Sequence, residues 1–287
     1  MQVLITGADG KIGRMLRLLW AAAPPPGLRP VWAARRAAGS DVIAWDIEFG
    51  PPPHLDPGAV VLHLAGRVCG DAAALRSNSV MAVNVCAAAK ASGARHVFLA
   101  SSAAVYGARA GHLAECHPPA PQTDYGRAKR DMEKAALCWA RGADGADGGG
   151  PGVTCLRIGN VLGADALSGA VRAGRDIVLD RVPGSDRGPL RSYIGPQSLA
   201  DILAGLLGRV AAGDAMPPIL NIAARTPVFM GDLLQGVRVP YRFGPLNAAA
   251  LPRVCLSTKR LAQVVAVAHQ PVSAMIGEWL DVMALAS

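Results

Sequence analysis

Tyr125 and Lys129 are of types, and at a spacing, that could carry out proton-transfer chemistry. They lie four residues apart in Tyr-Gly-Arg-Ala-Lys, so on a helix they would share one face. A cation close to a phenol stabilises the phenolate and lowers the pKa of the tyrosine, which then serves as an acid or base near neutral pH. Taken alone, the spacing favours an ordinary exposed aromatic–cation pair.

A glycine-rich segment near the N-terminus could bind phosphate. Gly7, Gly10 and Gly13 follow a short apolar run and precede a helical pattern. Glycines at such a turn let backbone N–H groups approach a pyrophosphate at the N-terminus of the helix. The pattern predicts a nucleotide site whose contacts come from Gly7, Asp9, Gly10, Lys11, Ile12 and Gly13.

Ser102 follows an apolar run over residues 96–100. A hydroxyl at the carboxyl end of a central strand would face a cleft and could hydrogen-bond a reacting C–O group. Taken alone, small residues at the end of a strand usually serve packing and not catalysis.

The elements that must position these residues alternate between strand and helix. We expect strands over residues 3–6, 31–34, 42–45, 60–64, 96–100, 153–158 and 219–222, and helices over 12–22, 78–92, 125–141, 198–209 and 274–285. Residues 142–152, GADGADGGGPG, are expected to be a flexible surface connection. This order predicts an α/β fold with a doubly wound parallel sheet. We place the dinucleotide-binding domain in residues 1–160, with a return at about 192–224, and a small substrate-binding domain in 161–287.

Composition excludes several classes of protein. The 287 residues are 51% hydrophobic and 17% charged, which suits a folded domain. No apolar run reaches the roughly 20 residues of a membrane span, and we expect residues 1–11 to open the first domain rather than to form a signal peptide. The net charge of +8 is scattered, so we expect no nucleic-acid partner. The six cysteines form no metal-ligand pattern, and we expect a reduced, cytoplasmic protein without a metal.

Together, and in this order, the glycine turn, Ser102 and the Tyr125/Lys129 pair resemble the extended short-chain dehydrogenase/reductase family, also called the NAD-dependent epimerase/dehydratase family. Further matches are Leu62-His63-Leu64-Ala65-Gly66, Asn84, Glu115 with Pro118, Pro119 and Pro121, residues 156–163, residues 191–194 with Leu199-Ala200, and residues 220–223. The resemblance implies a Rossmann-type sheet with a small C-terminal domain.

The resemblance also implies roles for individual residues. Tyr125 would exchange a proton with a substrate hydroxyl or carbonyl as hydride moves to or from a nicotinamide. Lys129 would hold the nicotinamide ribose, Ser102 would polarise the C–O group, and Asn84 would support the site or be a plain polar helix position. Other implied cofactor contacts are Asp46, Ile47, Leu64, Ala65, Gly66, Ala100, Ser101, Ile158, Asn160 and Val161. Implied substrate contacts are Arg67, Ser102, Ala103, Asn160 and Arg191.

Two departures from the family pattern change these expectations. NAD-selective members carry an acid at the end of the second strand, where this chain has Arg35 and Arg36, so we favour NADP over NAD. The dehydratases of the family carry an Asp–Glu pair directly after the position of Ser102. Ala103 and Ala104 stand there instead, and we expect no 4,6-dehydratase activity.

The substrate stays open between two classes. Arg191 matches an arginine that binds the diphosphate of nucleotide sugars, but Ser192, Gly195, Pro196 and Ser198 depart from that pattern. We therefore expect an NAD(P)-dependent oxidoreductase or epimerase for a sugar or nucleotide sugar. The alternatives are a dehydrogenase for a small sugar acid or other carbonyl compound, and a non-catalytic scaffold or sensor. A homodimer is expected by analogy.

Overall fold

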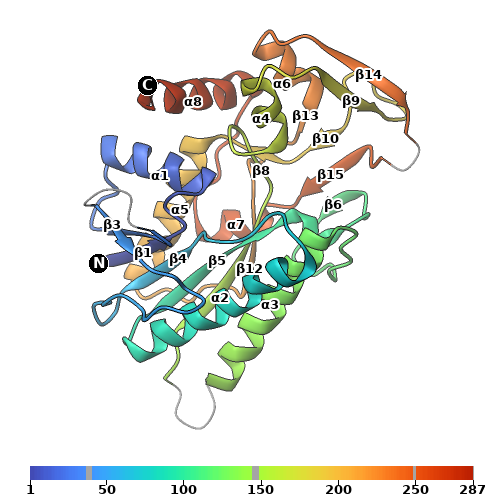
Figure 1. Cartoon of the computed structure of the whole chain (residues 1–287). Helices are drawn as coiled ribbons and strands as arrows, with labels where there is room; N and C mark the ends of the chain where they lie inside the picture. Colours follow the sequence, from blue (N-terminus) through green and yellow to red (C-terminus); the bar gives the residue numbers. More distant parts are fainter. Residues whose placement is uncertain (37–40, 144–148, 248–249, 287) are drawn as a thin grey trace.

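The computed structural model of the chain describes residues 1–36, 41–143, 149–247 and 250–286. Its centre is a seven-stranded parallel sheet in the order β12-β7-β5-β4-β1-β2-β3 (Figure 1). The strands are β1 (Gln2–Thr6), β2 (Arg29–Ala34), β3 (Val42–Ala44), β4 (Val60–His63), β5 (His96–Ser102), β7 (Gly152–Ile158) and β12 (Ile219–Ile222). The predicted α/β, Rossmann-type sheet is confirmed.

Helices cover both faces of this sheet. The helices of the described residues are α1 (Lys11–Ala22), α2 (Ala72–Ala91), α3 (Asp124–Ala143), α4 (Ala166–Arg172), α5 (Pro196–Ala211), α6 (Met230–Gly236), α7 (Lys259–Val264) and α8 (Val272–Leu285), with the 3₁₀ turn η1 (Ala103–Tyr106) after β5; α4 and α6 belong to the C-terminal part. Helices α2 and α3 pack together on one face, and α1, α5 and α8 contact one another on the other.

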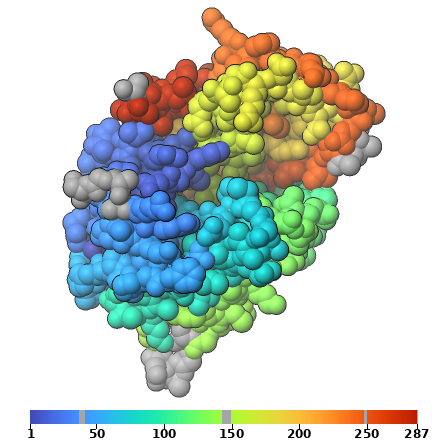
Figure 2. Space-filling model, in the orientation of Figure 1, coloured from blue at the N-terminus to red at the C-terminus, as the bar shows by residue number. Residues whose placement is uncertain are grey.

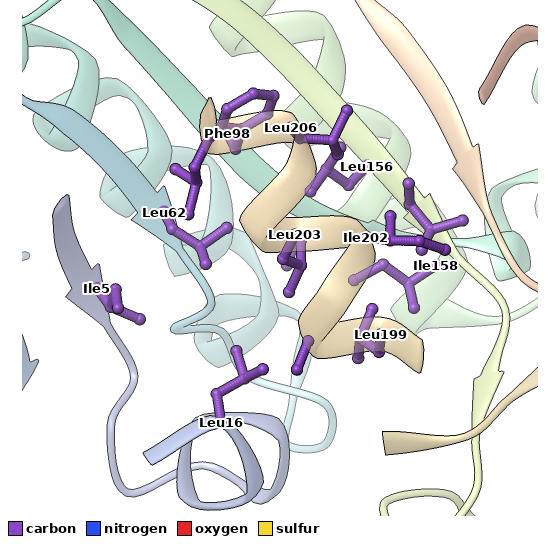
Figure 3. Packing of buried hydrophobic residues seen from close by; sticks show 14 of the residues in the cluster. Ile5, Leu16, Leu62, Phe98, Leu156, Ile158, Leu199, Ile202, Leu203 and Leu206 are labelled. Atoms are coloured by element: carbon purple, nitrogen blue, oxygen red, sulfur yellow. The ribbon is translucent and has the colours of Figure 1, made fainter. Parts of the chain in front are cut away.

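The core explains why the central strands are continuous apolar runs. Every residue of β1 and β4 is buried, because helices cover both faces of the sheet. Figure 3 shows α5 laying Leu199, Leu203 and Leu206 against Leu62 of β4 and Leu156 of β7. The apolar face of α5 thus repeats every three or four residues, as a helix on a sheet requires.

The rest of the chain forms small sheets at one end of the large one. One sheet has the order β13-β10-β15-β6, and two others are the pairs β11-β8 and β14-β9. Figure 2 shows the yellow to red residues of this part lying over one side of the blue and cyan residues. These strands are β6 (Gly111–Leu113), β8 (Asn160–Val161), β9 (Ile177–Arg181), β10 (Leu190–Arg191), β11 (Tyr193–Ile194), β13 (Val228–Phe229), β14 (Tyr241–Leu246) and β15 (Arg253–Leu256).

Most elements lie within a few residues of their expected bounds, and α2 is the main exception. It begins at Ala72 rather than at Asn78, because Asp71 caps it by accepting a hydrogen bond from the Ala74 N–H. The expected flexible connection over 142–152 is shorter than predicted, since α3 runs to Ala143 and β7 begins at Gly152; residues 144–148 lie outside the described residues.

No helix in the described part of the chain is both long and apolar enough to span a membrane.

Candidate active site

A cavity of about 380 Å³ opens at the carboxyl ends of β1, β2 and β4. This edge of a doubly wound sheet is where ligands bind in such folds. Eleven of the residues singled out in the sequence line it: Gly7, Asp9, Gly10, Arg35, Arg36, Asp46, Ile47, Leu64, Ala65, Gly66 and Arg67.

The glycine turn has no room for side chains. Gly7 has a φ of +77°, and a Cβ on it would lie 2.6 Å from the Ala65 backbone nitrogen. A Cβ on Gly13 would lie 2.2 Å from the Gly7 carbonyl oxygen, so Gly13 allows α1 to approach the turn. The N-cap of α1 is Gly10, which offers no side-chain cap. The first N–H groups of α1 are therefore left for a ligand, and the turn fits a pyrophosphate.

Ten of the expected cofactor residues do not line this cavity: Lys11, Ile12, Gly13, Ala100, Ser101, Tyr125, Lys129, Ile158, Asn160 and Val161. Lys11 donates from Nζ to the Ala164 carbonyl oxygen at 3.0 Å, which ties α1 to the C-terminal part. Ile158 and Val161 are buried in the core that contains α1 and α5, and Ile12 packs against that core. Asn160 donates from Nδ2 to the Ser192 carbonyl oxygen at 3.2 Å.

Beyond the glycine turn, the part of the cavity beside the ends of β2 and β3 carries both positive and negative side chains. Arg35 and Arg36 are exposed at the end of β2, and Asp46 and Ile47 follow β3. Asn84 of α2 donates to the Ile47 carbonyl oxygen at 2.8 Å. Asn84 therefore fixes the backbone of the segment after β3, where Ile47 and Glu48 line the cavity.

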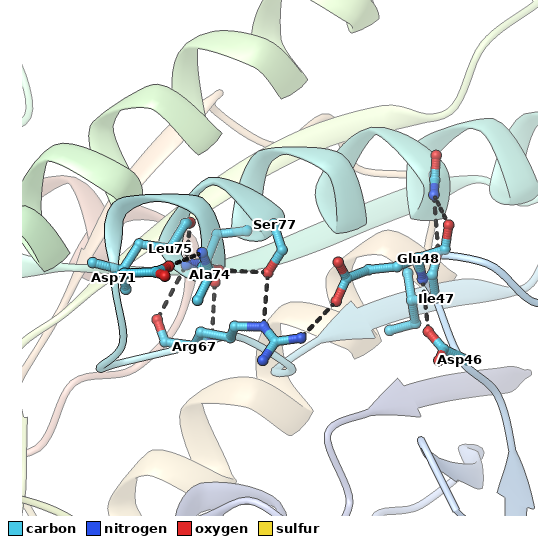
Figure 4. Close-up of polar contacts among 10 residues, drawn as sticks. Asp46, Ile47, Glu48, Arg67, Asp71, Ala74, Leu75 and Ser77 are labelled. Carbon is cyan, nitrogen blue, oxygen red and sulfur yellow. Dashed lines mark hydrogen bonds and ion pairs between the residues drawn. The ribbon is translucent and has the colours of Figure 1, made fainter.

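An ion pair that the sequence did not predict joins the segments after β3 and β4. Arg67 donates from Nη2 to Glu48 Oε1 at 3.0 Å and from Nε to Ser77 Oγ at 3.0 Å (Figure 4). Both Glu48 and Arg67 line the cavity. Arg67 was expected to contact substrate; it lies instead beside the dinucleotide cavity.

Tyr125 is the second residue of α3 and interacts with Ser102 at the end of β5. Burial raises the pKa of Tyr125, and a hydrogen bond with the Ser102 side chain lowers it; the net shift is upward. The expected lowering by Lys129 is therefore not found in the protein alone. The hydroxyl and the phenol nevertheless meet at the carboxyl end of a central strand, as predicted.

Lys129 is buried one turn further along α3. Its Nζ donates to the Ala100 carbonyl oxygen at 2.6 Å, and a Cβ on Gly66 would lie 3.1 Å from that Nζ. The ammonium thus lies directly behind the cavity wall. Burial lowers its pKa to about 8. The Ser101 hydroxyl turns away and donates to Glu133 at 2.5 Å, so Ser101 holds the scaffold together.

Asn78 is a site residue that the sequence analysis missed. Its Oδ1 accepts from the Arg67 N–H at 2.9 Å, and its Nδ2 donates to the Arg67 carbonyl oxygen at 3.1 Å. The same Oδ1 and Lys129 Nζ both border Gly66. The Asp71 cap was the available signal, because a helix that begins at residue 72 carries residue 78 on its second turn, inside the helix rather than at its start.

Arg191 lies in the C-terminal part, on β10. It is half-buried and donates to the carbonyl oxygen of its neighbour Leu190 at 2.9 Å. Burial lowers its pKa from the ordinary value. Within the described residues it has no carboxylate partner. Ala103 begins η1 directly after Ser102.

Comparison with protein-family models finds one match over residues 54–179, to the NAD dependent epimerase/dehydratase family. That stretch contains Ser102, Tyr125 and Lys129. No curated protein sequence matches the chain.

Solved structures of similar fold cover the whole chain at low identity. UDP-glucose-4-epimerase from Stenotrophomonas maltophila, with bound NAD and formylated UDP-arabinopyranose, has a TM-score of 0.78 and 20% identity, with 100% of both chains covered. MoeE5 in complex with UDP-glucuronic acid and NAD has a TM-score of 0.75 and 20% identity, again with 100% of both chains covered.

A dehydratase is also similar. The NAD-dependent NDP-hexosamine 5,6-dehydratase TunA has a TM-score of 0.73 and 17% identity, covering 99% of this chain and 98% of its own. The comparisons therefore do not exclude dehydratase chemistry. The family model over residues 54–179 and the α/β fold shared with these structures agree with the resemblance read from the sequence.

Proposed function

We propose that this protein is an NAD(P)-dependent oxidoreductase or epimerase that acts at a secondary alcohol or ketone of a sugar-type substrate. One observation carries the proposal. Tyr125 and Ser102 interact at the end of β5, and the buried Lys129 ammonium borders Gly66 on the wall of the glycine-turn cavity. A proton-transfer pair therefore adjoins a cavity suited to a dinucleotide.

The side chains divide the chemistry among them. A bound nicotinamide would supply the hydride acceptor or donor. The phenol oxygen of Tyr125 exchanges a proton with the oxygen of the substrate's secondary alcohol or ketone, and Ser102 donates a hydrogen bond to that substrate oxygen. The Lys129 ammonium, behind the wall of the cavity, would hold the nicotinamide ribose; it does not lower the pKa of Tyr125 in the protein alone. Because burial raises the pKa of Tyr125 in the protein alone, an additional positive charge or hydrogen bond must lower it in the working complex.

The choice between NAD and NADP depends on Arg35 and Arg36. Both are exposed, line the cavity and make no ion pair with a described residue. A guanidinium there suits a 2′-phosphate. The similar structures named above contain NAD, so they give the preference for NADP no support. We propose that NADP binds more tightly than NAD, which titration with both cofactors would test.

The substrate depends on Arg191. Its half-buried guanidinium, without a carboxylate partner among the described residues, suits an anionic group. The similar structures with UDP-sugars favour a nucleotide diphosphate; a sugar acid is the second candidate. Ala103 and Ala104 cannot exchange protons, so we propose that 4,6-dehydration is absent. A homodimer and a cytoplasmic location remain predictions.

A thermal-shift screen tests this function. Wild type, Arg191→Ala and the control Arg253→Ala, an exposed arginine on β15, are compared with NADH, NADPH, UDP-, GDP- and dTDP-sugars, and uronic and aldonic acids. We expect a nicotinamide cofactor to stabilise all three proteins. A nucleotide sugar should stabilise wild type and the control but not Arg191→Ala. If no nicotinamide cofactor binds, the proposed function is wrong.

A further inference from the structure

A fully buried ion pair lies behind the candidate catalytic residues and is not used in the mechanism above. Arg157 of β7 donates to Glu133 of α3 from two nitrogens, from Nε to Oε1 at 3.0 Å and to Oε2 at 3.3 Å, and from Nη2 to Oε2 at 2.8 Å. Their side chains are only 2% and 4% exposed. Ser101 Oγ donates to the same carboxylate at 2.5 Å. The carboxylate is thus held by two strands and one helix.

This carboxylate anchors α3 against the end of β5. Lys129 and Glu133 are four residues apart and lie on the same face of α3. Lys129 binds the Ala100 carbonyl oxygen, and Glu133 binds the side chain of the next residue, Ser101. Ser102 follows directly. Because Arg157 lies opposite Ser101 in the sheet register, the pair also fixes β7 to β5.

Stability alone does not account for such a pair. Well-packed apolar side chains of similar volume commonly stabilise a core as well as a buried ion pair does, since two charges must leave water to form it. The pair also leaves Arg157 Nη1 without a hydrogen-bond partner among the described residues, although the guanidinium packs 4.8 Å from the Tyr106 ring. A role linked to the neighbouring Lys129 explains why charge is present here.

The titratable groups around Lys129 come from several elements. His63 of β4 has its pKa lowered to about 3 by burial and by Lys129, so it is neutral. Burial raises the pKa of Cys155 on β7 well above its ordinary value and that of Cys86 on α2 to about 12. Arg157 is positive, and Glu133 carries the negative charge. Cys155 and then Glu133 act to raise the pKa of Lys129; because burial keeps the Cys155 thiol protonated, Glu133 is, among these described groups, the anion that offsets the buried ammonium.

We propose that Glu133 is a positioning residue that keeps the Lys129 ammonium charged and holds it in register with Ser102, with Arg157 fixing the carboxylate. The assignment rests on the proposed function for its catalytic meaning, but the effect on Lys129 is a property of the protein alone. Arg157 acts on Glu133 directly, because its hydrogen bonds fix the carboxylate in the position where it accepts from Ser101.

The direct test is a titration of Lys129 by NMR of lysine labelled with ¹³C at Cε. The chain has only five lysines (11, 90, 129, 134 and 259), and Lys129→Arg assigns the signal. In wild type the signal should titrate well below those of the other lysines. Glu133→Gln removes the negative charge, so the Lys129 pKa should fall by about one unit or more. Glu133→Asp keeps the charge and should restore most of the shift.

Asp131→Asn is the matched control, because Asp131 is an exposed acid on the same helix, paired with Arg130. It should leave Lys129 unchanged. If Glu133→Gln does not fold, Glu133→Gln with Arg157→Met is compared with Arg157→Met alone, because loss of the arginine cation by itself raises the Lys129 pKa; the double variant should have the lower Lys129 pKa of the two. An unchanged Lys129 titration in Glu133→Gln, or equal titrations in the double variant and Arg157→Met, overturns the inference.

The two proposals fail separately. Because the titration needs neither cofactor nor substrate, a shifted Lys129 in a protein that binds no nicotinamide refutes the proposed function and leaves the Glu133 assignment standing. If the protein binds a nicotinamide cofactor but the Lys129 pKa is unchanged in Glu133→Gln, the Glu133 assignment is refuted and the proposed function stands.

Discussion

Two Arg–Glu pairs lie within the described part of the fold, and they differ mainly in exposure. Arg67–Glu48 borders the cavity, with side chains 36% and 15% exposed, whereas Arg157–Glu133 is 2% and 4% exposed. The nitrogen–oxygen distances are similar, at 3.0 and 2.8 Å. Water screens the first pair, so its partners can exchange for a ligand at little cost. The second cannot open without leaving a charge inside the core. The same chemistry thus serves an adaptable cavity wall and a fixed scaffold.

Breaking the buried pair should have the largest effect on stability. Arg157→Met leaves the Glu133 carboxylate buried and unpaired, which we expect to cost about 3–5 kcal/mol of unfolding free energy. Urea denaturation followed by circular dichroism measures it. A loss below about 1 kcal/mol would mean that Glu133 readily takes up a proton or reaches water.

His96 is a buried titratable side chain without a charged partner among the described residues, and it should make the free energy of unfolding fall in acid. Burial lowers the pKa of His96, which bonds Thr154 at 3.0 Å, to about 4. The unfolded chain then binds a proton that the folded chain refuses. Its stabilisation is complete above the ordinary pKa near 6.5 and is lost as the pH falls towards 4, on the order of 3 kcal/mol for this residue. His96→Gln should flatten the stability–pH curve over that window; an unchanged slope would contradict the assignment.

How well these regions could be predicted from the sequence follows from their chemistry. The glycine turn and the apolar strands were predictable, because a tight turn and a sheet buried on both faces demand particular residue types in short segments. The Glu133–Arg157 and Glu48–Arg67 pairs were not, because each joins residues 19 or more positions apart through the sheet topology. Asn78 was missed for a local reason, the overlooked Asp71 cap.

Cofactor selectivity tests the adaptable region. If Arg35 and Arg36 bind a 2′-phosphate, NADPH should bind more tightly than NADH by about 1.5–3 kcal/mol, or one to two powers of ten. Arg35→Ala with Arg36→Ala should remove this difference, while Arg95→Ala, an exposed arginine just before β5, should keep it. Calorimetric titration decides, and tighter binding of NADH to wild type would refute the preference.

The smallest effect is expected at the exposed pair. Glu48→Gln should change the free energy of unfolding by about 0–1 kcal/mol, because water screens the lost charge and Arg67 keeps its bond to Ser77. Denaturation beside Arg157→Met gives the comparison directly. Equal losses in the two variants would remove the distinction between an adaptable and a fixed pair.

The most direct test of the proposed function is the turnover of Tyr125→Phe. The substrate is the sugar that gives the largest thermal shift, and the control is Tyr241→Phe, a tyrosine of β14 outside the cavity. The phenyl ring keeps the packing and loses the transferable proton, so turnover should fall by about 10²–10⁴-fold while cofactor affinity is retained. Near wild-type turnover in Tyr125→Phe, with Tyr241→Phe equally active, would contradict a proton-transfer role for Tyr125.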